Sequence, residues 1–276
     1  MIDRTIKTMK LYSQVERVFN ELRARGIDDE SPLRVEELTP FDQYHYHGTS
    51  AVEAAAERLR IVPGQHILEI GSGIGGPARY LADSTGAHVT ALELQADLNR
   101  TAATLTQRCG LEHRVEHRCG DVLKEDFGDR QFDAIVSWLA FLHIPDRQRL
   151  LNRCLQTLKP DGGIYVEDFT CKAAFTADET RILQEKVYCH YVPSENEYVD
   201  QLRTAGFTEV ECTDMTASWR EFVTARRGGY RDDDTRLREV HGDSVVDGLN
   251  DFYDAVVGLF QGGHLGGARI IGWKPR

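Results

Sequence analysis

From Gln65 onward, short apolar runs alternate with longer segments in which apolar residues recur every three to four positions. The short runs have the length of buried strands, and the longer segments have the spacing of amphipathic helices. Strands that alternate with helices through short links predict a parallel sheet with helices on both faces. The strands are expected at 66–70, 88–94, 114–121, 132–138 and 163–169.

The alternation of strand and helix stops after Phe169. Residues 170–206 have helical or loop character, 207–215 form a sixth apolar run, and a mostly helical segment continues to about Phe260. A final strand at 268–274 is expected to form a hairpin-like antiparallel pair at the sheet edge. The pattern therefore predicts an α/β fold with one seven-stranded sheet, mostly parallel, whose last strand is antiparallel.

The segment before the alternating pattern is expected to be largely helical. Residues 1–27 carry apolar side chains at near-helical spacing, which predicts an amphipathic helix. Residues 28–40 are polar and predict a connection. The stretch FDQYHYHGT at 41–49 is too polar for a core strand, so we expect an aromatic and histidine-rich loop that leads into a helix at 51–59.

The run HILEIGSGIGGPARYL, residues 66–81, combines a strand, a tight turn and a helix start. Gly71, Gly73, Gly75 and Gly76 allow a ligand to approach backbone N–H groups at the N-terminus of a helix. The same glycines also satisfy the G-x-G-x-x-G pattern of dinucleotide sites, so the turn alone does not select the ligand.

Glu69 narrows the choice of ligand. A carboxylate near the end of a strand that is buried on both faces is costly unless a polar or cationic group meets it. A positively charged ligand would meet it well, and a pyrophosphate would not. The alternative is an ordinary strand-to-helix turn in which Glu69 points to solvent.

Polar residues end several strands at one predicted edge of the sheet, because the carboxyl ends of parallel strands lie together. Glu93, 20 residues beyond Gly73, is placed to accept hydrogen bonds from ribose hydroxyls. Asp121 ends the third strand, where it can receive an adenine amino group. The fourth strand ends at Ser137 and Trp138 and is followed by His143, and the fifth strand ends at Asp168.

The composition of the chain limits its possible binding partners and its cellular compartment. The 276 residues carry a net charge of −11 with no basic run, which argues against nucleic acid. No apolar stretch approaches the roughly 20 residues that span a bilayer, and the N-terminus lacks the apolar centre of a signal peptide. The six cysteines are scattered, without C-x-x-C. We expect a cytoplasmic protein with no metal and no membrane partner, and the sequence leaves a homo-oligomer open.

Taken together, these motifs resemble the class I S-adenosylmethionine-dependent methyltransferases, which implies a Rossmann-like sheet. The resemblance rests on LEIGSGIGG, the strand end at Glu93, CGDVL, FLHIPD, LKPDGG and VEDF, and is strongest over 41–170. It implies S-adenosyl-L-methionine as the methyl donor, S-adenosyl-L-homocysteine as the product and no metal. The residues implied to hold the donor are Glu69, Gly71, Ser72, Gly73, Gly75, Glu93, Leu94, Asp121, Val122 and Ser137.

Within this superfamily, the chain is similar to small-molecule N-methyltransferases such as the phosphoethanolamine and sarcosine/dimethylglycine enzymes. It also resembles sugar O-methyltransferases and tocopherol-type methyltransferases. The first resemblance implies that Tyr44 or Tyr46 closes over the acceptor together with His143. The resemblance to the sugar O-methyltransferases implies that His143, as general base, works with Asp168, which would fix the tautomer of the imidazole.

The chain departs from the phosphobase enzymes at several positions. Leu139 stands where many N-methylating relatives carry an aspartate, and Tyr188 and His190 stand where the phosphobase enzymes use Arg and Tyr. Phosphoethanolamine is therefore not the expected acceptor, and a less charged molecule held by aromatic side chains is favoured. The residues expected around it are Tyr44, Tyr46, Trp138, Tyr188, His190, Tyr191 and Trp219.

The sequence thus predicts methyl transfer to a small molecule, most readily to the nitrogen of an amine or imidazole. The alternatives are O- or C-methylation of a phenol, sugar or prenyl-type metabolite, a donor-binding protein without turnover, and a nicotinamide oxidoreductase. A nicotinamide oxidoreductase would need a second nucleotide-binding half, which the pattern of strands and helices lacks. Residues 1–60 are assigned to N-terminal helices and an acceptor-covering loop, and 61–276 to the catalytic domain, with cap-like insertions at about 170–206 and 217–262.

Overall fold

The computed structural model describes residue 9, residues 12–128 and residues 131–276. Within this part of the chain, one seven-stranded sheet has the order β3-β2-β1-β4-β5-β7-β6. The strands are β1 (His66–Ile70), β2 (His88–Glu93), β3 (Val115–Cys119), β4 (Phe132–Trp138), β5 (Leu158–Cys171), β6 (Thr208–Asp214) and β7 (Leu265–Trp273).

The direction of the strands places the candidate site. β1 pairs in parallel with β2 on one side and β4 on the other, and β7 is antiparallel to both β5 and β6. The chain order reverses between β1 and β4, and in open α/β sheets the crevice at such a reversal, outside the carboxyl ends of the strands, is where ligands bind. The turn after β1 lies at this reversal.

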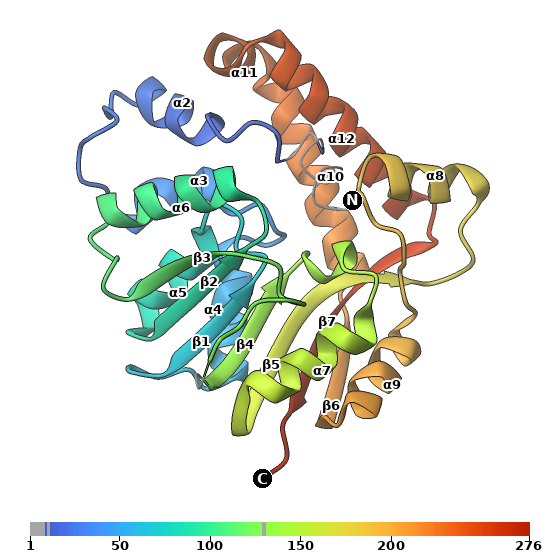
Figure 1. The fold of residues 1–276 in the computed structure, drawn as a ribbon. Coiled ribbons are helices and arrows are strands. Elements are labelled where there is room, and N and C mark those ends of the chain that lie inside the picture. The colour runs from blue at the N-terminus through green and yellow to red at the C-terminus, as the bar shows by residue number, and fades with distance from the viewer. Residues whose placement is uncertain (1–8, 10–11, 129–130) are drawn as a thin grey trace.

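Helices cover both faces of the sheet (Figure 1). Alternating residues of the strands pack against α4 and α5 on one face and against α7 and α9 on the other. Along β1, for example, Ile67 belongs to the first core and Leu68 and Ile70 to the second. The helices of these two layers are α4 (Thr49–Arg58), α5 (Gly76–Thr85), α6 (Ala96–Arg108), α7 (Arg147–Thr157) and α9 (Glu195–Ala205).

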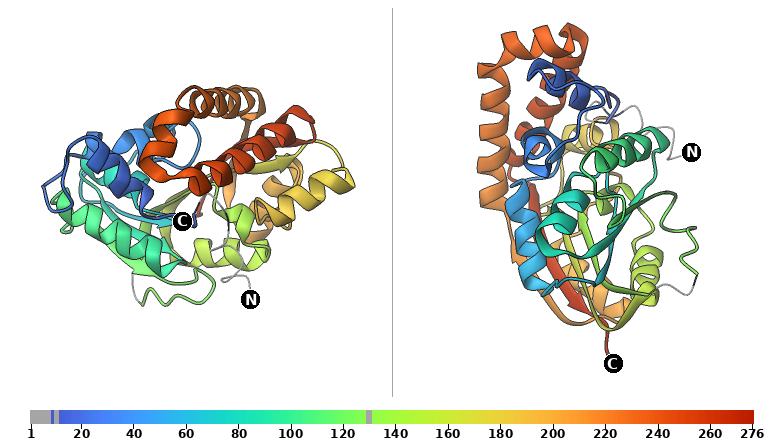
Figure 2. Two further views of the ribbon diagram at one scale, coloured as in Figure 1. Left: turned by 90° about the horizontal axis from the view of Figure 1, so that it is seen from above. Right: turned by 90° about the vertical axis from the view of Figure 1, so that its left-hand side faces the viewer.

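A second group of helices lies beyond the carboxyl ends of the parallel strands, at the end of the molecule opposite the C-terminus (Figures 1 and 2). An aromatic core joins α8, α10 and α12 to the ends of β5 and β7. A smaller core joins α2 and α3 to α6. These helices are α2 (Arg17–Ala24), α3 (Val35–Asp42), α8 (Ala177–Glu185), α10 (Thr216–Asp232), α11 (Asp234–His241) and α12 (Asp243–Gln261).

The N-terminal region differs from the sequence expectation. Residues 1–8 and 10–11 of the helix expected at 1–27 lie outside the described residues, and the remainder is helical only over α2. Met9 is buried and Tyr12 packs beside it, in the core that α10 and α12 form. The chain therefore turns before α2 so that both side chains face inward.

The polar connection expected at 28–40 contains a helix, α3. Its first turn is stabilised because the Glu37 carboxylate accepts a hydrogen bond from the N–H of Arg34 at 2.8 Å. Val35 and Leu38 are both buried, so this helix is anchored by two apolar side chains that the polar composition of the segment conceals. The final strand, β7, begins three residues earlier than expected. It lies between β5 and β6, so that β6 is an edge strand of the sheet.

Candidate active site

The turn after β1 has a backbone that suits glycine. Gly71, Gly73 and Gly75 have φ angles of 79°, 56° and 77°, a left-handed region that other residues rarely adopt. A Cβ atom on Gly76 would lie 2.4 Å from the carbonyl oxygen of Asp42. The absence of side chains thus lets the turn fold tightly against its neighbours and begin α5 at Gly76.

Glu69 is buried, as the strand pattern required, and its Oε2 has no hydrogen-bond partner among the described residues. Burial raises the pKa of this carboxyl to about 8; Arg79 opposes the rise and Glu93 adds to it. Arg79 is already paired with Asp42 at 2.9 Å, and both side chains are fully buried. Glu69 is therefore an unsatisfied acceptor that a ligand ammonium or N–H group would complement.

Glu93, the last residue of β2, is held in place by the main chain. Its Oε2 accepts a hydrogen bond from Gly73 N–H at 2.9 Å, and its Oε1 accepts one from Gln95 N–H at 2.8 Å. Burial raises the pKa of the carboxyl to about 7, although these N–H donors favour the charged form. The carboxyl group is fixed beside the glycine turn.

A cavity of about 690 Å³ runs along the carboxyl ends of β1, β2 and β3, and we call it the edge cavity. Asp121 at its margin is half-exposed; its Oδ1 accepts from Leu123 N–H at 2.9 Å, and its Oδ2 lies 2.8 Å from Lys124 Nζ. The lining includes the expected donor residues Gly71, Gly73, Glu93, Leu94, Asp121 and Val122.

A second cavity, of about 820 Å³, lies between the sheet edge and the covering helices, and we call it the aromatic cavity. Its floor contains Glu69 and Ser72, and the buried Oγ of Ser72 has no partner among the described residues. Most of its wall is aromatic or aliphatic. The expected residues Tyr44, Tyr46, Trp138 and His143 line it, together with Tyr12, Leu142, Phe169, Val223, Tyr253 and Val256.

The two cavities meet. Gly71, Gly73, Tyr12 and His143 line both of them, so one molecule in each cavity would come into contact at these residues. His143 ends a short 3₁₀ turn (Phe141–His143) that follows β4, which brings its ring to the junction.

The state of His143 follows from its surroundings. Its Nδ1 lies 3.2 Å from the carbonyl oxygen of Tyr188. Because a carbonyl only accepts, Nδ1 carries the hydrogen and Nε2 keeps a free lone pair. Burial lowers the pKa of His143 to about 4, more than the Tyr188 carbonyl raises it. The imidazole is therefore neutral at pH 7, with Nε2 able to accept a proton.

The expected pairing of Asp168 with His143 is wrong. Asp168 is fully buried, and its Oδ2 accepts hydrogen bonds from Arg147 Nη2 at 2.8 Å and from the Tyr198 hydroxyl at 3.0 Å. These contacts tie β5 to α7 and α9. The carbonyl of Tyr188, not Asp168, therefore fixes the tautomer of His143.

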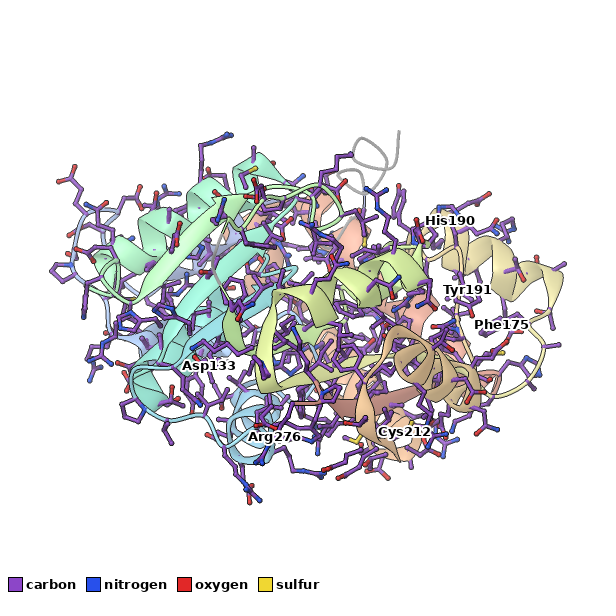
Figure 3. The ribbon with its side chains drawn as sticks, turned by 60° about the horizontal axis from the view of Figure 1, so that its bottom comes forward. Asp133, Phe175, His190, Tyr191, Cys212 and Arg276 are labelled. Carbon is purple, nitrogen blue, oxygen red and sulfur yellow. The ribbon has the colours of Figure 1, made fainter. Side chains whose placement is uncertain are left out.

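Several other expected site residues lie away from the two cavities. Ser137 donates a hydrogen bond from Oγ to the Ile70 carbonyl at 2.8 Å, joining β4 to β1. Trp219 is fully buried behind Tyr46, with their rings 5.0 Å apart. His190 and Tyr191 lie near α8 and α9, as Figure 3 shows, and the Tyr191 hydroxyl accepts from Gln201 Nε2 at 2.8 Å. Tyr188 contributes its carbonyl, rather than its ring, to the site.

Sequence reasoning did not identify Arg226 of α10. Its guanidinium donates hydrogen bonds to the carbonyl of Tyr44 at 3.0 Å and to that of His45 at 2.8 Å, and it lines the aromatic cavity. It thereby holds the loop that carries Tyr44 and Tyr46. No motif distinguishes this arginine from its neighbours in the helix, so only the fold reveals it.

Among the described residues, no group of three or more His, Cys, Asp or Glu side chains is arranged to hold a metal ion. In the same part of the chain, no helix is both long and apolar enough to cross a membrane. The six cysteines all carry free thiols.

Comparison with known proteins agrees with this geometry. Residues 67–162 match a family described as "Methyltransferase domain". The chain is 30% identical over 178 residues to the glycine/sarcosine/dimethylglycine N-methyltransferase of Actinopolyspora halophila, covering 64% of this chain and 32% of the relative. It is 32% identical over 199 residues to phosphoethanolamine N-methyltransferase 1 of Zea mays, covering 71% and 38%. The chain thus matches only about a third of the length of these curated relatives.

The fold is similar to that of a solved structure, phosphoethanolamine N-methyltransferase 2 of Haemonchus contortus in complex with phosphomonomethylethanolamine and S-adenosylhomocysteine. The TM-score is 0.79 at 21% identity, covering 85% of this chain and 55% of that chain. At this identity the likeness concerns the fold alone.

Proposed function

We propose that this chain, which belongs to the class I S-adenosylmethionine-dependent methyltransferases, transfers a methyl group to the nitrogen of a small acceptor molecule. One observation carries the proposal: the edge cavity and the aromatic cavity meet at Gly71, Gly73, Tyr12 and His143. A donor in the edge cavity and an acceptor in the aromatic cavity would face each other there. The N-methyltransferase names of the relatives support nitrogen as the atom that is methylated.

The residues around the edge cavity, together with Glu69 and Ser72 in the adjoining floor of the aromatic cavity, fit S-adenosylmethionine. The unpartnered Oε2 of Glu69 and Oγ of Ser72 suit the polar methionine end of the donor, and the fixed carboxyl of Glu93 suits the ribose hydroxyls. Leu94 and Val122 offer apolar contacts to the adenine, with Asp121 near its amino group. Ser137 would act indirectly, because its bond to Ile70 holds the strand ends that carry the site.

His143 is the candidate general base. S-adenosylmethionine supplies an electrophilic methyl group on a positively charged sulfur. The acceptor lone pair forms the new bond to that carbon while the C–S electrons stay with sulfur, and the acceptor proton passes to Nε2 of His143. The hydrogen bond from Nδ1–H to the Tyr188 carbonyl orients the ring for this step. Tyr44 and Tyr46 are proposed to close over the acceptor.

Transfer to a hydroxyl group is the second candidate. The same neutral base could take a proton from an O–H group, and the apolar wall of the aromatic cavity accommodates a phenol. The mass of the product and its site of methylation distinguish the two outcomes.

The test combines a methyl-transfer assay with one substitution. The intact protein is incubated with S-adenosylmethionine and a panel of amines, imidazoles and phenols, and products are read by mass. With an acceptor found in this way, His143→Ala should lower kcat by about 10²-fold. The dissociation constant for S-adenosylhomocysteine should change little. Full kcat in His143→Ala would remove the general-base role, and transfer to phenols alone would favour O-methylation.

A further inference from the structure

Two arginines stand against the tyrosine wall of the aromatic cavity. The guanidinium of Arg17 lies 5.3 Å from the ring centre of Tyr44. That of Arg226 lies 5.9 Å from the ring centre of Tyr46 and 4.6 Å from that of Phe222. Aromatic faces attract cations, but these rings already stabilise a positive charge each. A second cation nearby would be repelled by the first.

Beside these aromatic rings, away from the end assigned to the donor, the described residues of the cavity offer no free negative charge to offset this repulsion. Among the described residues that line it, only Asp42 and Glu69 carry carboxyl groups. Asp42 is neutralised by its buried contact with Arg79. Glu69 lies beneath the glycine turn, at the end assigned to the donor, and burial favours its neutral form. A protonated or quaternary amine would therefore lose its hydration without gaining a counter-ion.

The cavity is equally poor in groups for an anion. The hydrogen bonds of Arg226 go to main-chain carbonyls, so this side chain is occupied in holding its loop. His45 is buried and its Nε2 bonds to the Gly48 carbonyl at 2.9 Å. The remaining wall is uncharged and mostly aromatic or aliphatic, and its polar groups are neutral hydroxyl and ring N–H groups. Its apolar part includes Leu142, Phe169, Val223, Phe252 and Val256.

We infer that the aromatic cavity selects an uncharged acceptor with an apolar body and one N–H or O–H group, and that transfer stops before a quaternary ammonium forms. The inference rests on the proposed function. A neutral amine that gains a methyl group can lose its proton to Nε2 of His143 and leave uncharged. A tertiary amine has no proton to lose, so its methylation would leave a permanent cation in a cavity that repels it.

The direct test compares two ligands of the same shape, 3-tert-butylphenol and (3-hydroxyphenyl)trimethylammonium. Their affinities for the intact protein, saturated with S-adenosylhomocysteine, are measured by ligand-detected NMR at pH 7.5. The neutral phenol should bind at least about tenfold more tightly, and equal or tighter binding of the cation would overturn the inference. Each ligand alone in solution controls for self-association.

A pair of variants tests whether charge is the cause. Val256→Asp adds a carboxylate to the cavity wall, and Val256→Asn adds a group of the same shape without charge. Only the aspartate variant should gain affinity for the trimethylammonium ligand, by about tenfold. A folded Val256→Asp that binds the cation no better than Val256→Asn contradicts the electrostatic explanation. Val223→Asp and Val223→Asn repeat the comparison if thermal unfolding shows that the first pair is damaged.

The outcomes separate this inference from the proposed function. A protein that does not bind S-adenosylhomocysteine fails as a methyltransferase, whatever its acceptor preference. A protein that binds it and converts a tertiary amine to a quaternary product is a methyltransferase whose acceptor site is not selective in the way inferred here. Product mass, which shows whether a tertiary amine has gained a methyl group, decides the second case.

Discussion

At the scale of single residues, Glu69 is the position where the demands of folding and of binding conflict most clearly. A carboxyl group near the buried end of a strand lacks the solvent that would stabilise its charge, and its Oε2 has no partner among the described residues. Its pKa of about 8, raised chiefly by burial, measures this cost. Such a cost is expected at sites that a ligand completes.

Glu69→Gln should change how stability depends on pH. Between the ordinary glutamate pKa of 4.5 and about 8, the folded protein retains a proton that the unfolded chain has released. The free energy of unfolding should therefore fall as pH rises through this window. The glutamine variant should lose part of that slope and be more stable at pH 8, by about 1–3 kcal/mol.

Urea unfolding of the donor-free protein at pH 5, 6, 7 and 8 measures this effect. Glu112→Gln, at an exposed position, is the matched control and should leave the slope unchanged. A Glu69→Gln variant that is less stable than the original protein at pH 8, or that has the original slope, would show that the buried carboxyl is charged and compensated.

Residue-level reasoning from the sequence identified Glu69, Glu93 and His143 because the two glutamates lie near the ends of recognisable strands and His143 follows one. It assigned Asp168 to the wrong partner. Two strand-end residues can share an edge of the sheet and still point to different layers, and Asp168 bonds to Arg147 and Tyr198. Side-chain direction at a strand end depends on packing that the sequence pattern does not contain.

At the scale of elements, one buried ion pair joins α3 to α5 beneath the glycine turn. Asp42 ends α3, Arg79 lies in the second turn of α5, and their closest charged atoms are 2.9 Å apart with no exposure of either side chain. Asp42 also contacts the position where a Cβ of Gly76 would lie. The pair therefore fixes how the N-terminal segment is attached to the sheet.

Removing one partner of the Asp42–Arg79 pair should lower the free energy of unfolding more than removing both. Asp42→Ala leaves the Arg79 guanidinium buried and uncompensated, which should cost about 3–5 kcal/mol of unfolding free energy. The double variant Asp42→Ala/Arg79→Met should recover much of the loss. Asp178→Ala, which breaks the exposed contact with Arg181, should cost less than about 1 kcal/mol.

Chemical denaturation of these variants measures the three losses. A double variant as unstable as Asp42→Ala would mean that packing at the site, rather than the unpaired charge, limits stability.

Elements with strong periodic patterns were predictable from the sequence, and β1 at 66–70 and β4 at 132–138 have the expected bounds. The short helices were not. α3 depends on a side-chain bond to Arg34 and on two buried apolar residues, and α2 begins late because Met9 and Tyr12 turn inward. The local amino-acid composition indicates neither the contacts that stabilise α3 nor those that delay the start of α2.

At the scale of the whole molecule, the site is assembled from segments far apart in the chain. The edge cavity is built mainly by the strand ends and the turns after them, with Tyr12 beside them. The aromatic cavity also needs the loop at 41–49 and helices α10 and α12. The sequence predicted the first well because its residues lie in motifs at strand ends. Of the second cavity it predicted the residues of the glycine turn, Tyr44, Tyr46, Trp138 and His143. It did not predict the residues of α10 and α12 that line this cavity, because helix packing determines which covering residues face inward.

Every proposed role of the site requires a bound donor, and donor binding can be measured without knowing the acceptor. Titration calorimetry of S-adenosylhomocysteine into the intact protein and into Glu93→Gln at pH 8 tests it directly, with Glu112→Gln as the control. We expect one bound molecule per chain and a dissociation constant at least about tenfold higher for Glu93→Gln, since a charged hydrogen-bond acceptor is lost. No binding, or equal binding by Glu93→Gln, would contradict the proposed donor site.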